Sequence, residues 1–327
     1  MNDPSMQAFV VHAPGGPEAL CLEARPFPSV GDGQVRIRVR AFGLNRAEIM
    51  TRKGQSPSVA FPRILGIEAV GTIDACPSGR LVRGDIVATA MGGMGRAFDG
   101  SYAEYVVVPE DQVQAVQTTL SWSTLAALPE MVQTAYGALF RGLCILPGAT
   151  ILIRGGTSSV GLMASILAHD HGCTVVSTTR DATRRHLLER YGARHVVIDK
   201  GNVVDDVRSL IPDGVDNVLD LVGTPTIADN FDALSPSGVL CLAGILSGEW
   251  ALRDFSPMFD IPTDKRLTAY VGDAQDFMHT PLQEIIRLIE RGLLDIPIGK
   301  TVPFKNTPDA HREIETNTTP GKWVVSL

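Results

Sequence analysis

The sequence has few cysteines, and their spacing does not predict a metal knot or a redox motif. Five cysteines are scattered over 327 residues, and no two of them form a Cys-x-x-Cys pair. An odd and scattered set is typical of reduced thiols and argues against a disulfide framework. We therefore expect a cytoplasmic protein. The cysteines are Cys21, Cys76, Cys144, Cys173 and Cys241.

Aromatic residues and clustered positive charge are also scarce. Aromatic residues make up 6% of the chain, and the formal net charge is −7 with no basic stripe. A dedicated nucleic-acid-binding protein needs clustered Lys and Arg, so we expect no nucleic-acid partner. Apolar runs of transmembrane length are missing, and Met1 to Met6 have no signal-peptide character. We therefore expect no membrane partner.

The seven histidines form no cluster with the spacing of metal ligands. His169 and His171 end a predicted helix, but residues two apart on a helix do not share a face. A Ser-His-Asp triad cannot be read from the chain either. The histidines therefore predict neither a metal site nor nucleophilic catalysis.

The sequence does contain a change of pattern that predicts two domains. Its 44% hydrophobic content is enough for a large core. Residues 6 to about 120 are β-rich, and Gln34 to Arg40 alternates strictly between apolar and arginine side chains. From about 122 to 265 strands and helices alternate, which predicts an α/β fold with a doubly wound parallel sheet. We expect strands at 150–154, 174–179, 195–199, 217–222 and 238–244, helices at 159–169, 182–191, 203–211, 226–234 and 281–291, and a closing strand at 323–326.

The most informative segment is a strand, a small-residue turn and a helix between Ala149 and Ala168. The turn contains Gly155, Gly156, Thr157, Ser158 and Ser159, and the helix pattern begins near Val160 and includes Gly161. This order directs backbone N–H groups and a helix N-terminus to one point, which suits a pyrophosphate. An ordinary turn between strand and helix is the alternative, because the middle position is Ser158 instead of Gly. We interpret the segment as a dinucleotide site.

The end of the next strand indicates which dinucleotide. NAD-binding units carry Asp or Glu there to bind the adenosine ribose, whereas this chain has Thr179 and Arg180, followed by Arg184. Guanidinium groups and a hydroxyl suit a 2′-phosphate, which a carboxylate would repel. A helix that happens to start with basic residues is the alternative, and Asp181 weakens the positive field. We predict NADPH.

Segments over nearly the whole chain resemble the medium-chain dehydrogenase/reductase superfamily, and within it the quinone oxidoreductase-like branch. They occur in the order that the family has, and they are 41–48, 66–71, 84–87, 98–105, 127–137, the glycine and serine turn, 242–245 and 321–324. The resemblance implies a GroES-like β-rich catalytic domain, residues 1–121 completed by 268–327, and a Rossmann domain, residues 122–267. It also implies a cleft between them for nicotinamide and substrate, and a homodimer or homotetramer.

The departures from the family pattern are equally informative. Zinc-dependent members hold the metal with a Cys near 41–48, a His in 66–71 and a third ligand before the Thr-Ala-Tyr-Gly stretch. Here Asn45, Ile67 and Glu130 stand at these places. Neutral Asn and Ile cannot replace a thiolate and an imidazole, and the cysteine-rich lobe of a structural zinc is absent. We predict that the protein holds no metal.

Without a Lewis acid, the expected chemistry is hydride transfer from NADPH to a quinone or an α,β-unsaturated carbonyl. Asn45 is the candidate amide donor to the substrate, or else an Asn that stabilises a turn from strand to helix. Tyr136 is a candidate proton donor, although a buried structural Tyr is commoner and solvent can also deliver the proton. The resemblance places Thr134 and Lys322 near the cofactor, with a solvated loop lysine as the alternative for Lys322. Val222, Gly244 and Ile245 follow sheet strands, where ligands bind in open α/β sheets, and Tyr270 is a candidate for the nicotinamide side.

Two other functions fit the same fold. A trans-2-enoyl thioester reductase uses the same hydride chemistry on an acyl-CoA, and would need a basic entrance and a long apolar slot. A non-catalytic NADPH-binding sensor or structural protein would share the cofactor residues and differ in the substrate site. A zinc alcohol dehydrogenase is the least favoured alternative.

Overall fold

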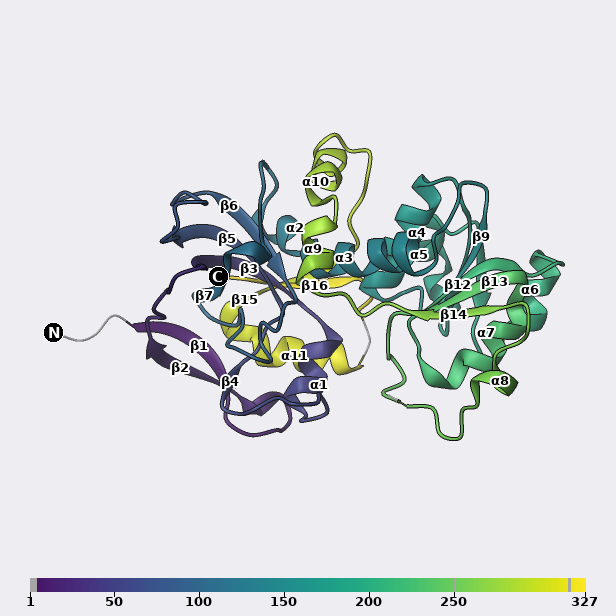
Figure 1. Ribbon diagram of the computed structural model, residues 1–327, viewed down its shortest axis with the longest axis horizontal. Coiled ribbons are helices and arrows are strands. Elements are labelled where there is room, and N and C mark those ends of the chain that lie inside the picture. The colour runs from purple at the N-terminus through teal and green to yellow at the C-terminus, as the bar shows by residue number, and fades with distance from the viewer. Residues whose placement is uncertain (1–4, 250, 317–318) are drawn as a thin grey trace. The chain divides into compact units, whose positions relative to one another are not determined.

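The computed structural model describes residues 5–249, 251–316 and 319–327 and divides into two compact units. Unit 1 comprises Met1–Gln133 and Gly272–Leu327, and unit 2 comprises Thr134–Val271 (Figure 1). Both ends of the chain thus contribute to unit 1. Among the described residues, every helix is too short or too polar to cross a bilayer.

Unit 1 is built from two β-sheets and short helices, as a GroES-like domain requires. A seven-stranded sheet has the order β15-β16-β3-β5-β6-β8, with β7 paired to β3, and a three-stranded sheet has the order β2-β1-β4. The strands are β1 (Ser5–Val11), β2 (Leu20–Pro26), β3 (Gln34–Leu44), β4 (Arg63–Ile64), β5 (Glu68–Ala75), β6 (Ile86–Ala90), β7 (Tyr105–Pro109), β8 (Val113–Ala115), β15 (Ile298–Pro303) and β16 (Lys322–Ser326). The α-helices are α1 (Arg46–Arg52), α2 (Trp122–Ala126), α9 (Ala274–His279), α10 (Leu282–Glu290) and α11 (Thr307–Thr316), and α3 (Pro129–Gly137) crosses the boundary between the units.

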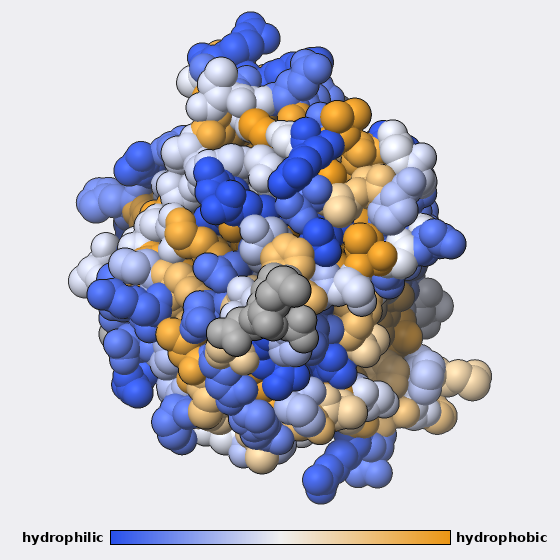
Figure 2. Space-filling view, turned by 90° about the vertical axis from the view of Figure 1, so that its left-hand side faces the viewer, coloured by the Kyte–Doolittle hydropathy of each residue, from blue (hydrophilic) through white to orange (hydrophobic). Residues whose placement is uncertain are grey.

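The alternating pattern of β3 is the local reason for this sheet. Val35, Ile37 and Val39 are buried in the core of unit 1, while the arginines between them lie on the other face. The closing strand β16 pairs antiparallel with β3, so the end of the chain returns to the first domain as predicted. In Figure 2, hydrophobic residues lie scattered among hydrophilic ones on the outer face near β1 and β2, as expected for a unit whose apolar side chains lie inside.

Unit 2 is a Rossmann-type sheet with the order β11-β10-β9-β12-β13-β14. All of its strand pairs are parallel. Helices α4 and α5 lie on one face of this sheet and α6 and α7 on the other, so the sheet is doubly wound (Figure 1). The strands are β9 (Thr150–Arg154), β10 (Thr174–Thr179), β11 (His195–Ile198), β12 (Val215–Asp220), β13 (Leu234–Leu242) and β14 (Arg266–Ala269), and the helices are α4 (Ser159–Asp170), α5 (Arg185–Arg190), α6 (Val204–Leu210), α7 (Ile227–Ala233) and α8 (Pro257–Asp260).

The structure divides the chain later than the sequence boundaries at 121/122 and 267/268. Helix α2 packs against β3, β5 and β16, which keeps it in unit 1. Strand β14 pairs with β13, which extends unit 2 to Val271. Both differences have the same cause. The sequence pattern shows where a helix or strand begins, whereas the division into units depends on which other helices and strands it packs against.

Candidate functional site

The turn between β9 and α4 presents free backbone donors at a helix N-terminus. Ser158 caps α4: its hydroxyl accepts from the Gly161 N–H at 3.1 Å and donates to the Gly155 carbonyl at 2.8 Å. The N–H groups of Ser159 and Val160 have no acceptor among the described residues. Because two such donors and the dipole of a twelve-residue helix favour an anion, this turn can hold a phosphate group.

The glycines of the turn are required by close approach. A Cβ on Gly161 would lie 2.6 Å from the Gly155 carbonyl oxygen, so any side chain there would separate helix from strand. A Cβ on Gly156 would lie 2.0 Å from the hydroxyl of Ser177 in β10. That hydroxyl is buried and has no hydrogen-bond partner among the described residues. Thr157, partly exposed, completes the turn.

The end of β10 carries one unengaged cation. The Thr179 hydroxyl is occupied locally, because it donates to the Asp181 carbonyl and accepts from the Asp181 N–H, both at 3.1 Å. Arg184 lies 3.4 Å from the Asp181 carboxylate. Arg180 is exposed, and in the part of the chain that the structure describes it makes no hydrogen bond or ion pair. Arg180 is therefore the cation at this strand end that is free to bind an added phosphate.

The segments after β12 and β13 run side by side at the carboxyl edge of the sheet. The Leu246 N–H donates to the Leu221 carbonyl at 3.0 Å, and the Ser247 N–H donates to the Val222 carbonyl at 2.9 Å. A Cβ on Gly244 would lie 2.6 Å from the Leu221 carbonyl, so this approach needs glycine. Val222, Gly244 and Ile245 are each partly exposed there. Ligands of open parallel sheets bind at this edge.

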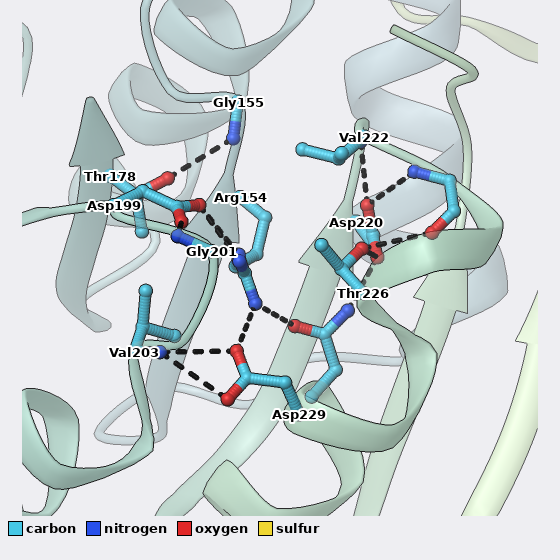
Figure 3. Close-up of polar contacts among 12 residues, drawn as sticks. Arg154, Gly155, Thr178, Asp199, Gly201, Val203, Asp220, Val222, Thr226 and Asp229 are labelled. Carbon is cyan, nitrogen blue, oxygen red and sulfur yellow. Dashed lines mark hydrogen bonds and ion pairs between the residues drawn. The ribbon is translucent and has the colours of Figure 1, made fainter. Parts of the chain in front are cut away.

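At the same edge lies a buried ionic cluster around Arg154, the last residue of β9 (Figure 3). Its guanidinium pairs with Asp199 after β11, at 2.8 Å, and with Asp229 in α7. Next to it, the Asp220 carboxylate at the end of β12 accepts from the N–H groups of Val222 and Gly223 at 2.6 and 2.9 Å. We call these residues the Arg154 cluster: Arg154, Asp199, Asp220 and Asp229. It fixes the strand ends and turns that border the edge.

Unit 1 contains a second buried polar group, centred on Lys322. Its ammonium donates to Asn45 Oδ1 at 2.5 Å and pairs with Glu68 Oε1 at 2.6 Å and Glu130 Oε2 at 3.1 Å. Lys322 and Glu68 are fully buried, and Glu48 is 1% exposed. The Glu48 carboxylate accepts from the Asn45 and Ile67 backbone N–H groups. We call this set the Lys322 knot: Asn45, Glu48, Glu68, Glu130 and Lys322.

Burial and charge set the protonation of the knot. Burial raises the pKa of Glu48 to about 8, and the charge of Glu68 adds to the rise. Burial alone would lower the pKa of Lys322, but the carboxylates of Glu68 and Glu130 outweigh it and raise the pKa above its usual value. At neutral pH the knot therefore contains a charged ammonium and a protonated Glu48.

Two of the sequence candidates, Asn45 and Lys322, lie together in this knot. Both Asn45 amide hydrogens are engaged, one by Glu48 Oε1 at 3.2 Å and one by Glu68 Oε1 at 2.8 Å. The amide is thus held rigidly and can donate to a substrate only by giving up a carboxylate. Lys322 begins β16 and is fully buried, so it is not a solvated loop lysine.

Three further candidates lie in unit 2. The Tyr136 hydroxyl is half-buried and has no hydrogen-bond partner within the described residues, while its ring lies 4.6 Å from that of Phe140. Tyr270 packs over Gly137, where a Cβ would lie 1.9 Å from its ring. Thr134 is 7% exposed on α3. Tyr136 is the one of these whose hydroxyl is free for chemistry.

Comparison with known proteins places this geometry in a family. The model of the alcohol dehydrogenase GroES-like domain matches residues 31–118, and that of the zinc-binding dehydrogenase domain matches residues 191–325. The quinone oxidoreductase of Pseudomonas aeruginosa is 28% identical over 95% of this chain and 96% of its own length. The rat synaptic vesicle membrane protein VAT-1 homolog is 27% identical over 98% of this chain and 83% of its own length.

A solved structure gives the same assignment. A mycobacterial protein in complex with NADPH superimposes with a TM-score of 0.87 and 26% identity, covering 99% of this chain and all of its own. This chain belongs to the medium-chain dehydrogenase/reductase superfamily. Within the superfamily it falls in the quinone oxidoreductase-like branch, and it is an oxidoreductase.

Two sets of residues in this superfamily member are not evident from its sequence. Glu68 is an acidic residue within an apolar stretch, which is a signal of a buried, partnered charge, whereas the polar neighbours of Glu48 give no such signal. Arg154 ends the apolar run of β9 and gives the same signal. The signal reveals burial but not the partners, which come from segments far away in the sequence.

Proposed function

We propose that the protein is an NADPH-dependent, zinc-independent reductase that transfers hydride to a quinone or an α,β-unsaturated carbonyl. NADPH as the cofactor is supported by Arg180 at the end of β10, which makes no hydrogen bond or ion pair among the described residues. It follows a strand that lies beside the glycine turn with two free N–H donors. Independence from zinc is supported by the Lys322 knot, because the Lys322 ammonium already lies among the oxygen atoms of Asn45, Glu68 and Glu130.

The residues of unit 2 fit NADPH. The N–H groups of Ser159 and Val160 would bind the pyrophosphate, with Ser158 holding the helix end in place. Arg180, assisted by Arg184, would bind the 2′-phosphate, where a carboxylate would favour the unphosphorylated ribose. Thr134, Val222, Gly244, Ile245 and Tyr270 complete the proposed cofactor residues.

The bound cofactor would supply the hydride, so the protein has to orient the substrate and manage one proton. We assign the free hydroxyl of Tyr136 as the donor of the proton to the reduced substrate, with solvent as the alternative donor. The Asn45 amide, fixed by Glu48, Glu68 and the Lys322 ammonium, would keep its part of unit 1 rigid and polar. A small-molecule electrophile, a homodimer or homotetramer and a cytoplasmic location belong to the same proposal.

The relatives support this function. The Pseudomonas aeruginosa protein is named a quinone oxidoreductase, and the mycobacterial structure contains NADPH. Both align over almost the whole of this chain. We propose that this protein shares both properties, the reduction of quinones and the binding of NADPH.

The test is the rate of NADPH oxidation with a simple quinone and, separately, with an α,β-unsaturated ketone, with NADH in parallel. We expect turnover with NADPH and at least about tenfold less with NADH, since one charged hydrogen bond contributes about 1.5–3 kcal/mol. Equal rates with both cofactors would contradict the role of Arg180. Tight NADPH binding without turnover on either acceptor would contradict the substrate class.

A further inference from the structure

We infer that the Lys322 ammonium is a built-in cation in unit 1: it fills the position that a divalent metal would need, and removing it opens a divalent-cation site. The inference deepens the zinc-independence in the proposed function. It concerns the donor set of the Lys322 knot and uses no property of the cofactor.

The oxygen atoms around the ammonium form a ligand set for a hard cation. Asn45 Oδ1, Glu68 Oε1 and Glu130 Oε2 lie 2.5, 2.6 and 3.1 Å from Lys322 Nζ. Amide and carboxylate oxygens are the ligands that Ca²⁺, Mg²⁺ and Mn²⁺ prefer. With Lys322 in place, the described residues contain no group of His, Cys, Asp or Glu that could hold a metal.

The ligand atoms are held in position by other groups. Glu68 Oε2 accepts from the Glu130 N–H at 2.9 Å, and Glu68 Oε1 accepts from the Asn45 amide at 2.8 Å. Such outer contacts orient metal ligands in general. The oxygens come from three different places in the sequence, and the orientation of Asn45 and Glu68 does not depend on Lys322 alone.

Gly43 in β3 leaves room for the side chains of Glu68 and Lys322 because it has no side chain of its own. A Cβ at this position would lie 2.3 Å from Glu68 Oε1 and 2.5 Å from Lys322 Cε. The lysine stem and the carboxylate therefore fill the volume that a side chain at Gly43 would take. Shortening Lys322 to Ala frees the volume of its stem while leaving the oxygens in place.

A metal ion does not fit while the ammonium is present. A divalent ion bound to the same oxygens would lie close to a positive charge in a buried region, where repulsion between charges is strong. The set also lacks the sulfur and nitrogen ligands that are usual for zinc. Removing Lys322 takes the ammonium away from the Glu68 and Glu130 carboxylates, and a divalent ion with waters can take its place.

The experiment measures Mn²⁺ binding to chelator-treated protein, by equilibrium dialysis and by the loss of the free Mn²⁺ EPR signal. The proteins are the wild type, Lys322→Ala, the double variant Lys322→Ala with Glu68→Gln, and Lys305→Ala. Lys305 is exposed and lies outside the knot, so its variant removes one ammonium from unit 1 as a matched control. We expect one Mn²⁺ per chain for Lys322→Ala, at least tenfold weaker binding for the double variant, and no bound Mn²⁺ for the other two.

If Lys322→Ala does not fold alone, refolding is followed by near-UV circular dichroism with MnCl₂ or with ethylammonium, which is a free analogue of the lysine head group. We expect either cation to restore the folded signal of Lys322→Ala but not that of the double variant. A folded Lys322→Ala that binds no Mn²⁺, or an unfolded one that neither cation restores, would overturn the inference. So would stoichiometric Mn²⁺ or Zn²⁺ on the wild type.

These readouts need no NADPH and no electron acceptor. Reductase activity in a wild type whose Lys322→Ala variant binds no metal would therefore reject the inference and leave the proposed function standing. If Lys322→Ala binds the metal but the wild type never oxidises NADPH, the inference stands and the proposed function is rejected.

Discussion

The two units contain buried ionic clusters with the same inventory but different geometry. The Lys322 knot pairs one ammonium with Glu68 and Glu130, and the Arg154 cluster pairs one guanidinium with Asp199 and Asp229. In the knot, the Glu68 side chain is completely buried and that of Glu130 is 13% exposed. In the Arg154 cluster, the Asp199 and Asp229 side chains are 11% and 10% exposed.

The difference lies in what each cation can do. A guanidinium is a planar fork that reaches several partners at once, and Arg154 uses it to connect the ends of β9 and β11 with α7. An ammonium is a compact point charge, closer to a metal ion in size and shape. The Arg154 cluster therefore braces a sheet edge, whereas the Lys322 knot is a cation site that holds its own cation.

The largest expected effect comes from removing the central cations. Lys322→Met removes the cation beside the fully buried Glu68 carboxylate and breaks the pair with Glu130, and we expect the free energy of unfolding to fall by about 3–5 kcal/mol. Arg154→Met should cost less, because water reaches both carboxylates that pair with Arg154, whereas Glu68 in the knot is completely buried. Urea unfolding of both variants measures the difference. Equal losses would contradict the distinction between the two clusters.

The next largest effect is a loss of NADPH affinity, which does not involve the two ionic clusters. Gly161→Val places a side chain against the Gly155 carbonyl, and we expect NADPH affinity to fall at least about 100-fold, or roughly 2.7 kcal/mol. Fluorescence titration with NADPH measures the affinity, and circular dichroism checks that the fold is kept. Unchanged affinity in a folded variant would mean that the turn does not hold the cofactor.

A smaller effect distinguishes the two cofactors. Arg180→Asp combined with Arg184→Ala should weaken NADPH about 10- to 100-fold and leave NADH nearly unchanged, since a charged hydrogen bond contributes about 1.5–3 kcal/mol. Arg194→Ala, which removes an exposed charge elsewhere in unit 2, is the control. An equal loss for NADPH and NADH would reject the 2′-phosphate assignment.

The last effect is gradual, at about 1 kcal/mol per pH unit: it is a pH dependence of stability that arises in the Lys322 knot. The folded state raises the pKa of Glu48 from 4.5 to about 8, so between these values it keeps a proton that the unfolded chain has released. Stability should therefore fall as pH rises, by about 1 kcal/mol per pH unit between pH 5 and 7, and become level above pH 8. Glu48→Gln should remove this contribution, which urea unfolding of both proteins across the range measures. Parallel pH profiles would show that Glu48 does not titrate as described.

The sequence predicted the elements of unit 2 well because their signals are local. The strand, turn and helix at 150–169 follow one another directly, and the observed β9 and α4 are Thr150–Arg154 and Ser159–Asp170. The structure divides the chain after Gln133 and Val271, later than the boundaries read from the sequence, because the packing of α2 and the pairing of β14 are not local signals.

The Lys322 knot could not be predicted in the same way. Asn45, Glu68, Glu130 and Lys322 stand far apart in the sequence, and β-sheet pairing between β3, β5 and β16 brings three of them together. The sequence suggested Asn45 as an amide donor to the substrate or as an Asn that stabilises a turn, and in the structure both amide hydrogens are engaged by carboxyl groups. It left Lys322 between a cofactor role and a solvated loop, and the structure instead buries it among carboxylates.

The most direct test of the central claim is the rate of quinone reduction by NADPH before and after exhaustive chelation, with the zinc content measured on the same samples. The account predicts far less than one zinc ion per chain and an unchanged rate, because the Lys322 ammonium occupies the cation position. Stoichiometric zinc, with activity that is lost on chelation and restored by adding zinc back, would contradict it.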